Sequence, residues 1–161
     1  MKYEYRERLL PADRDIVRRI VESTGFFYPE EELIAVELVD THLSRGEESG
    51  YHFLFCQDEI NAVLGYTCFG PIPGTLASFD IYWIAVDRSH QGHGIGKQLL
   101  EQTEKTIRGM GGTRIYVETS SRILYDPTQS FYRNSGYHEE ATLKDFYAPG
   151  DNKIIYVKEI S

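Results

Sequence analysis

The residues with the clearest chemical meaning form a glycine-rich turn, Gln91-Gly92-His93-Gly94-Ile95-Gly96. The turn follows the apolar run 80–86 and precedes the amphipathic segment 97–103, a pattern that predicts a strand, a tight turn and a helix N-terminus. The first N–H groups of a helix lack partners within it and together carry about half a positive charge. Glycine leaves this backbone open to a bulky anion. The pattern favours a phosphate-binding site over a purely structural loop.

Two common phosphate-binding motifs do not fit this turn. The motif G-x-x-x-x-G-K-[ST] would need glycine at Gln91 and a hydroxyl group at Gln98. The dinucleotide fingerprint G-x-G-x-x-G would need glycine at Lys97, and it usually lies in the first βαβ unit of its domain. The spacing that remains is Q-x-x-G-x-G.

A second motif lies nearer the C-terminus, where Phe131-Tyr132-Arg133-Asn134-Ser135-Gly136-Tyr137 has the form F-Y-x-x-x-G-[FY]. With both motifs, residues 51–160 resemble the GNAT superfamily of acetyl-CoA-dependent N-acetyltransferases. The resemblance implies an α/β (α+β) GNAT fold, with a mixed central sheet of about six to seven strands and about four flanking helices, as one domain over residues 1–161. It also implies acetyl-CoA as cosubstrate and a primary amine as acceptor. The resemblance is weakest over the first fifty residues.

The resemblance assigns a set of residues to coenzyme A. The turn and its helix would meet the diphosphate, while backbone groups at the end of the preceding strand would pair with the pantetheine amides, as in β-augmentation, and supply an oxyanion contact. His90 and His93 are expected at the surface, able to meet only the phosphate end of the cofactor. The expected cofactor-binding residues are Ile84, Ala85, Val86, Gln91, Gly92, His93, Gly94, Ile95, Gly96, Lys97 and Tyr132.

Tyr132 matches the tyrosine of the family that commonly protonates the leaving thiolate. A phenol with a pKa near 10 is a reasonable proton donor to an alkyl thiolate. The alternative is a buried tyrosine that only packs against the cofactor. Phe131 is expected to pack in the core, and Arg133 is expected on a solvated helix face rather than on a phosphate.

Acetyl transfer also needs a neutral amine, and deprotonating an alkyl amine at pH 7 costs roughly 4 kcal/mol. Asp80 is the first candidate base because it stands eleven residues before Gln91, which resembles the placement of the base in the family's histone acetyltransferases. It lies roughly 13 Å along the strand from Ile84, so a water relay would be needed. Glu118, at the end of the next strand, is the competing carboxylate. The alternatives are a solvated residue at a strand start for Asp80, and an exposed strand end or a helix-cap partner for Glu118.

Several aromatic residues are candidates for an acceptor pocket, since an aromatic wall suits a cation or an apolar group. They are Phe26, Phe27, Tyr28, Tyr82, Trp83, Tyr125 and Tyr147. Three functions stay open on the sequence. The first is N-acetyl transfer by direct attack of the amine. The second is a non-catalytic acyl-CoA-binding sensor or interaction domain, and the third is transfer from another acyl-CoA.

Hydrophobic periodicity and turn residues predict the elements that hold these groups. Strands are expected at 2–8, 51–56, 62–69, 78–86, 114–118, 137–147 and 153–160. Helices are expected from Asp13 to Gly25, from Pro29 to about Leu43, and from the glycine turn to Gly109, with Glu104 on the polar face. A short last helix is expected to begin with Asp126 as its capping residue and to end at Gly136.

Composition limits the partners and the chemistry. A net charge of −8 over 161 residues argues against nucleic acid and mildly favours cationic substrates. The polar N-terminus and the absence of a long apolar run predict a cytoplasmic protein without a membrane segment, and leave a homodimer open. Cys56 and Cys68 lie in apolar strands and are expected as free core residues, so neither a disulfide nor a catalytic thiol is predicted. No metal is expected.

Overall fold

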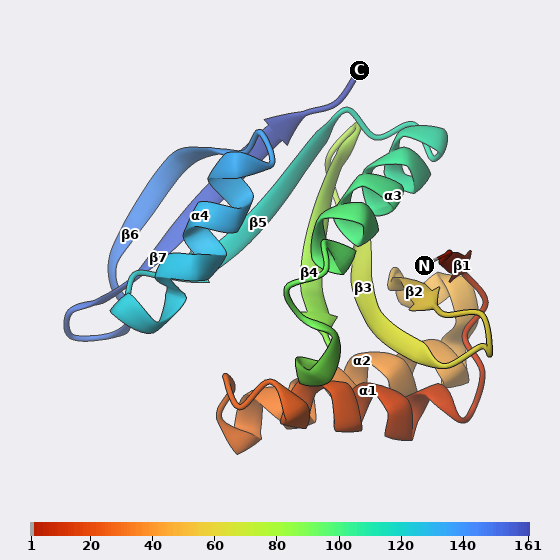
Figure 1. Ribbon diagram of the computed structural model, residues 1–161. Helices are drawn as coiled ribbons and strands as arrows, with labels where there is room; N and C mark the ends of the chain where they lie inside the picture. Colours follow the sequence, from red (N-terminus) through yellow and green to blue (C-terminus); the bar gives the residue numbers. More distant parts are fainter. Residues whose placement is uncertain (1) are drawn as a thin grey trace. The chain divides into compact units, whose positions relative to one another are not determined.

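The computed structural model describes residues 2–161, and these form two compact units that alternate along the chain (Figure 1). The first unit holds residues up to Gly70 together with Trp83–Thr106, and the second holds Pro71–Tyr82 together with Ile107–Ser161. Seven strands make one sheet in the order β1-β2-β3-β4-β5-β7-β6. The strands are β1 (Glu4–Arg6), β2 (His52–Gln57), β3 (Val63–Pro71), β4 (Ser78–Val86), β5 (Arg114–Ser120), β6 (His138–Ala148) and β7 (Asp151–Glu159).

Four α-helices accompany the sheet within the described residues: α1 (Asp13–Ser23), α2 (Pro29–Arg45), α3 (Ile95–Gly109) and α4 (Asp126–Asn134). Three single-turn 3₁₀ helices, which the sequence pattern did not predict, add η1 (Gly46–Ser49), η2 (Arg88–His90) and η3 (Ile123–Tyr125). The strands and helices predicted from periodicity are all present. The mixed sheet and the helix number expected of the fold are therefore confirmed.

The first unit is built around the two N-terminal helices, which lie side by side in Figure 1. On α1 the apolar residues Val17, Ile20 and Val21 are fully buried, at the helical spacing seen in the sequence. They join one hydrophobic cluster with aromatic side chains of β2 and β3, among them Phe53, Phe55, Tyr66, and with Ala85 of β4. The end of β4 is therefore held by the core of this unit.

The chain from β4 to β5 is a crossover, because these two strands pair in parallel. Ser78–Asp80 lie opposite Arg114–Tyr116. A parallel connection cannot be a tight turn and usually contains a helix, which here is α3. In the first unit α3 is held to β3 by a buried hydrogen bond of 2.7 Å between the hydroxyl groups of Thr103 and Thr67.

The second unit is built on antiparallel pairing of β7 with both β5 and β6. The helix α4 packs on one face of this sheet, where Tyr132 contacts Tyr156 of β7, with ring centroids 6.3 Å apart. Gln129 Nε2 of the same helix donates to the carbonyl oxygen of Ser120 at 3.0 Å. These contacts fix α4 to the end of β5 and to the middle of β7.

Two local predictions were wrong. Glu104 is buried rather than exposed on α3, because it lies four residues after Leu100 and three before Ile107 and so borders the apolar stripe. Asp126 is not the capping residue of α4. The N-cap is Tyr125, and Asp126 is the first helical residue, where its charge still complements the helix dipole.

One buried ion pair joins β1 to α1, and local sequence patterns did not predict it. Arg6 holds Asp13 with two hydrogen bonds, 2.7 Å from Nη1 to Oδ2 and 2.9 Å from Nη2 to Oδ1. The Asp13 side chain is 1% exposed and that of Arg6 is 18% exposed. The Leu10 amide also donates to Asp13 Oδ2, at 2.7 Å. Two of the three hydrogen bonds to this carboxylate thus come from β1.

We predict that Asp13→Ala lowers the free energy of unfolding by about 3–5 kcal/mol, because it leaves the Arg6 guanidinium partly buried without its partner. Urea unfolding measures the change. Asp15→Ala is the matched control, since the Asp15 side chain is 85% exposed, and it should change stability by less than about 0.5 kcal/mol. Equal effects of the two substitutions would contradict the prediction.

Candidate active site

The glycine turn lies between η2 and α3 and is open to solvent. Gly92 and Gly94 have φ of 82° and 79°, a conformation that favours glycine over other residues. A Cβ atom built on either glycine meets no heavy atom within 4 Å. The glycines are therefore needed for backbone conformation and not to relieve packing, and the space beside them is free. Residues Gln91 to Gly94 are exposed, whereas Ile95 is buried and anchors the helix.

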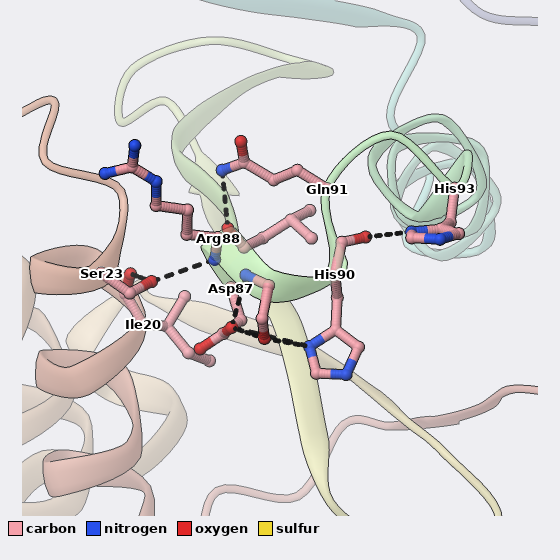
Figure 2. A network of polar contacts seen from close by, with 9 residues as sticks. Ile20, Ser23, Asp87, Arg88, His90, Gln91 and His93 are labelled. Carbon is pink, nitrogen blue, oxygen red and sulfur yellow. Dashed lines mark hydrogen bonds and ion pairs between the residues drawn. The ribbon is translucent and has the colours of Figure 1, made fainter.

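Hydrogen bonds from side chains hold the turn in shape, as Figure 2 shows. Gln91 Nε2 donates to the carbonyl oxygen of Val86 at 3.0 Å, so the first residue of the motif is tied to the end of β4. His93 Nδ1 donates to the carbonyl oxygen of His90 at 3.2 Å. The amide of Gln98 donates to Gly94 at 3.1 Å and begins the helical pattern. The amides of Ile95 to Lys97 precede it and form the helix N-terminus.

A second group of contacts fixes η2 to the first unit. Asp87 accepts hydrogen bonds from the Ser89 amide at 3.0 Å and from the Ser89 hydroxyl at 2.5 Å, and these bonds lower the pKa of Asp87. The Arg88 amide donates to the Ser23 hydroxyl of α1 at 3.1 Å. His90 Nδ1 lies 3.5 Å from Asp87 Oδ1. The roles of Asp87, Ser89 and Ser23 were not predicted from the sequence, although an Asx-x-Ser pattern before a glycine turn is a local signal for such hydrogen bonds.

The backbone of residues 84–86 lies at the end of β4, in the first unit. Here β3 approaches closely, because a Cβ atom on Gly65 would lie 2.8 Å from the Ala85 carbonyl oxygen. The amide of Asp87 donates to the Leu64 carbonyl oxygen at 2.8 Å. Glycine at position 65 thus allows β3 to lie close to residues 84–86. Backbone contacts to the cofactor were predicted for this segment.

The two candidate carboxylates lie on one face of the second unit's sheet. Asp80 of β4 pairs with Tyr116 of β5, and Glu118 is two residues further along the same strand. Lys153 of β7 is the third member of this group, since its Nζ atom lies 3.0 Å from Glu118 Oε1. The structure therefore brings together the two carboxylates that the sequence left as competitors and adds a lysine that the sequence analysis did not single out.

Burial raises the pKa of Asp80 to about 6, with a further rise from the Glu118 charge and a smaller, opposing effect of Lys153. Desolvation disfavours the ionised carboxylate, and a like charge nearby does the same. A carboxylate with this pKa is mostly ionised at neutral pH yet more basic than an ordinary aspartate. Such a group suits general-base chemistry near pH 7.

Tyr132 of α4 is 5% exposed and lies in an aromatic cluster of the second unit. Its ring contacts those of Phe131, Tyr137 and Tyr156 at centroid distances of 5.5, 5.6 and 6.3 Å. Burial raises the pKa of the Tyr132 phenol, so it keeps its proton at neutral pH. Arg133 Nη1 donates to the Tyr156 hydroxyl at 3.3 Å, which gives this arginine a contact within its own unit.

The aromatic residues proposed for an acceptor pocket divide between the two units. Phe27, after α1, contacts Trp83 of β4 at a centroid distance of 4.6 Å, and Phe26 contacts Phe27 at 5.3 Å. Tyr28, also in the first unit, is 57% exposed. The second unit holds the other three candidates, Tyr82, Tyr125 and Tyr147.

Both cysteines are free and buried. Burial raises the pKa of Cys56 to about 11 and also raises that of Cys68, so both thiols are protonated at neutral pH. Within residues 2–161, no group of three His, Cys, Asp or Glu side chains is arranged to hold a metal ion. Among the helices of the same residues, none combines the length and apolar character that crossing a membrane requires.

A mixed sheet with a parallel crossover that begins at an open glycine turn defines an α/β protein with this turn at a helix N-terminus. The chain belongs to the acetyltransferase (GNAT) family, whose sequence profile matches residues 15–137. The match includes both the Q-x-x-G-x-G turn and the F-Y-x-x-x-G-Y segment. The resemblance inferred from these two motifs is confirmed.

Solved structures with the same fold include a GNAT-family protein of Desulfovibrio desulfuricans, with 46% sequence identity and a TM-score of 0.96 over 99% of this chain and 100% of the other. An aminoglycoside 6′-N-acetyltransferase in complex with coenzyme A has 20% identity and a TM-score of 0.79, over 100% and 98% of the two chains. The PaiA N-acetyltransferase of Thermoplasma acidophilum, also with coenzyme A, has 16% identity and a TM-score of 0.73, over 99% and 100%. A comparison with curated protein sequences finds no match.

The raised pKa of Asp80 predicts a cost in stability at neutral pH. Because the folded protein holds this proton more tightly than the unfolded chain, the free energy of unfolding falls as the pH rises from about 4 to about 6. Asp80→Asn removes the cost and should be more stable than the wild type at pH 8, on the order of 1 kcal/mol, since solvent screens a half-buried group. Urea unfolding at pH 4 and pH 8 measures it.

The difference between Asp80→Asn and the wild type should vanish near pH 4, where the wild-type carboxyl is protonated. Asp15→Asn, at an exposed position, controls for the loss of one negative charge. A stability difference for Asp80→Asn that is the same at both pH values would contradict the prediction.

Proposed function

We propose that this protein is an acetyl-CoA-dependent N-acetyltransferase that moves an acetyl group to a primary amine by direct attack of the amine on the thioester. The observation that carries the proposal is the open glycine turn at the N-terminus of α3, in a chain of the GNAT family. Two structures of the same fold contain coenzyme A, which supports a coenzyme A thioester as the partner of the turn.

The turn and the start of α3 would bind the diphosphate of coenzyme A. Backbone amides carry this role, because the side chains of Gln91 and His93 donate to neighbouring carbonyl groups. Lys97 is exposed at the same helix end and adds a positive charge. Backbone groups of Ile84 to Val86 would pair with the pantetheine arm and stabilise the oxyanion.

Asp80 would take the proton from the amine, directly or through a water molecule, and Tyr132 would return a proton to the departing thiolate. A base with a pKa of about 6 can remain ionised at pH 7. A phenol whose pKa is raised by burial remains a donor at the same pH. Glu118, paired with Lys153 at 3.0 Å, is less free to accept a proton than Asp80.

Direct attack is supported by the state of the cysteines. A covalent acetyl-enzyme would need an activated nucleophile, and thiols react as thiolates. Cys56 and Cys68 are buried with raised pKa values, so they are poor candidates for that role. The amine itself is then the nucleophile.

The function is tested by mixing the protein with acetyl-CoA and a panel of amines and following release of coenzyme A with a thiol reagent. We expect release of coenzyme A with at least one amine. The kcat/KM of this reaction should rise with pH through about pH 6, as Asp80 becomes ionised. Calorimetric binding of acetyl-CoA without release from any amine would instead indicate a sensor or interaction domain. Propionyl-CoA and succinyl-CoA, tested alongside, define the acyl donor.

Gly94→Ala should raise the KM for acetyl-CoA about tenfold or more, because the new Cβ stands in the path of the diphosphate and the residue is strained at φ of 79°. Gly74→Ala is a matched control: its φ is 80°, its Cβ also meets nothing within 4 Å, and it lies in the turn between β3 and β4. Both variants should lose similar stability. The same KM for acetyl-CoA in Gly94→Ala and Gly74→Ala would argue against a phosphate site at the glycine turn.

Tyr132→Phe should lower kcat about tenfold or more while changing acetyl-CoA affinity little, because it removes the proposed proton donor but keeps the ring. Tyr137→Phe removes another buried hydroxyl from the same aromatic cluster and should keep most of the activity. Steady-state kinetics and calorimetric titration with coenzyme A separate the two effects. A Tyr132→Phe enzyme with wild-type kcat would exclude the role of general acid.

A further inference from the structure

Lys153 is an unusual lysine, because its side chain is only 16% exposed and its charged end is held on two sides. Its Nζ atom lies 3.0 Å from Glu118 Oε1 and 4.4 Å from the centre of the Phe146 ring. A surface lysine normally keeps its ammonium group in water and moves freely. The fixed position of this ammonium group calls for an explanation beyond solubility.

The sheet register places Lys153 beside the candidate base. Asp80 pairs with Tyr116, and two residues further along β5 stands Glu118, on the same face. Ser120, two residues further again, pairs with Lys153 of β7. The neighbouring strands β4, β5 and β7 therefore each contribute one charged side chain to this face: Asp80, Glu118 and Lys153, in that order. By strand geometry the Cα atoms of Asp80 and Glu118 are about 8 Å apart.

We propose that Lys153 is a positioning residue for the acetyl transfer, which holds Glu118 in place and balances its charge so that Asp80 can serve as the base. The proposal rests on the acetyltransferase function proposed above. Without the ammonium group, two carboxylates would face each other across β4 and β5, and like charges at this range favour protonation of one of them. Asp80 is the more buried of the two and would take the proton.

Several other charged groups on this side of the sheet pair with one another. Arg114 Nη1 donates to Glu159 Oε1 at 2.8 Å, and Arg114 Nε donates to the Tyr116 hydroxyl at 3.3 Å. Arg122 Nε lies 3.3 Å from Asp151 Oδ2. Tyr82 follows Asp80 by two residues on β4. The charges that act on Asp80 are those of Glu118, which raises its pKa, and Lys153, which lowers it.

The decisive substitution is Lys153→Met, which keeps the apolar stem and removes the charge. The pKa of Asp80, about 6 in the wild type, should rise on the order of one unit. The acid limb of the kcat/KM profile should move to higher pH by the same amount, with activity recovered at pH 8. Lys153→Arg should restore the wild-type profile. Lys105→Met, at an exposed position of α3, controls for the loss of a lysine elsewhere.

Glu118→Gln tests the same coupling with the opposite sign, and remains available if Lys153→Met fails to fold. Removing the like charge and freeing Lys153 should lower the pKa of Asp80 and move the acid limb to lower pH. If Lys153 acts on stability alone, Lys153→Met should have a lower melting temperature, while the acid limb of the kcat/KM profile stays at the wild-type pH in both variants. That result would overturn the proposal.

The coupling can be measured without turnover. Carboxyl-carbon NMR titration of the full chain labelled with ¹³C-aspartate, with Asp80→Asn to assign the signal, gives the pKa of Asp80 in each variant. An unshifted Asp80 signal in both Lys153→Met and Glu118→Gln refutes the proposal whatever the activity. If the wild type releases no coenzyme A with any amine, the proposed function fails, while the titration still decides whether Lys153 controls the charge state of Asp80.

Discussion

The parallel pairing of β4 with β5 is the constraint from which the rest of the arrangement follows. Two parallel neighbours cannot be joined by a short turn, so the chain must leave the end of β4, form α3 and return to the start of β5. The glycine turn stands where this crossover begins, and the helix N-terminus comes with it. The same pairing sets Asp80 beside β5 and so determines which carboxylate becomes its neighbour.

The candidate functional residues lie in two kinds of environment. The turn is exposed, built from backbone and held by short-range hydrogen bonds, which suits a charged ligand that arrives with its own water. Asp80 and Tyr132 are more buried, and burial raises the pKa of each. A base that is partly desolvated is less stable in its ionised form, so the stability of the fold and the basicity of Asp80 oppose each other.

Much of the fold was predictable because its signals are local. The periodicity of Ile95, Leu99 and Leu100 predicts α3 and its buried face, and the turn residues before and after it predict its ends. The family, and with it the mixed sheet and its four helices, came from two short motifs. Contacts between distant segments were not predictable: Lys153 is 35 residues from Glu118 in sequence, and no periodicity relates them. The burial of Asp13 was not predicted either, because a charged residue at a helix start is usually solvated.

The order of strands in the second unit has a consequence for how the chain can be made and shortened. The strand β7 lies between β5 and β6, so among the strands of this unit the one that is synthesised last is an interior one. Until Asp151–Glu159 has emerged, β5 and β6 lack the neighbour they share, and Glu118 lacks Lys153. Vectorial synthesis therefore leaves this unit unfinished until β7 has emerged, and loss of β7 would remove an interior strand of the sheet rather than an edge strand.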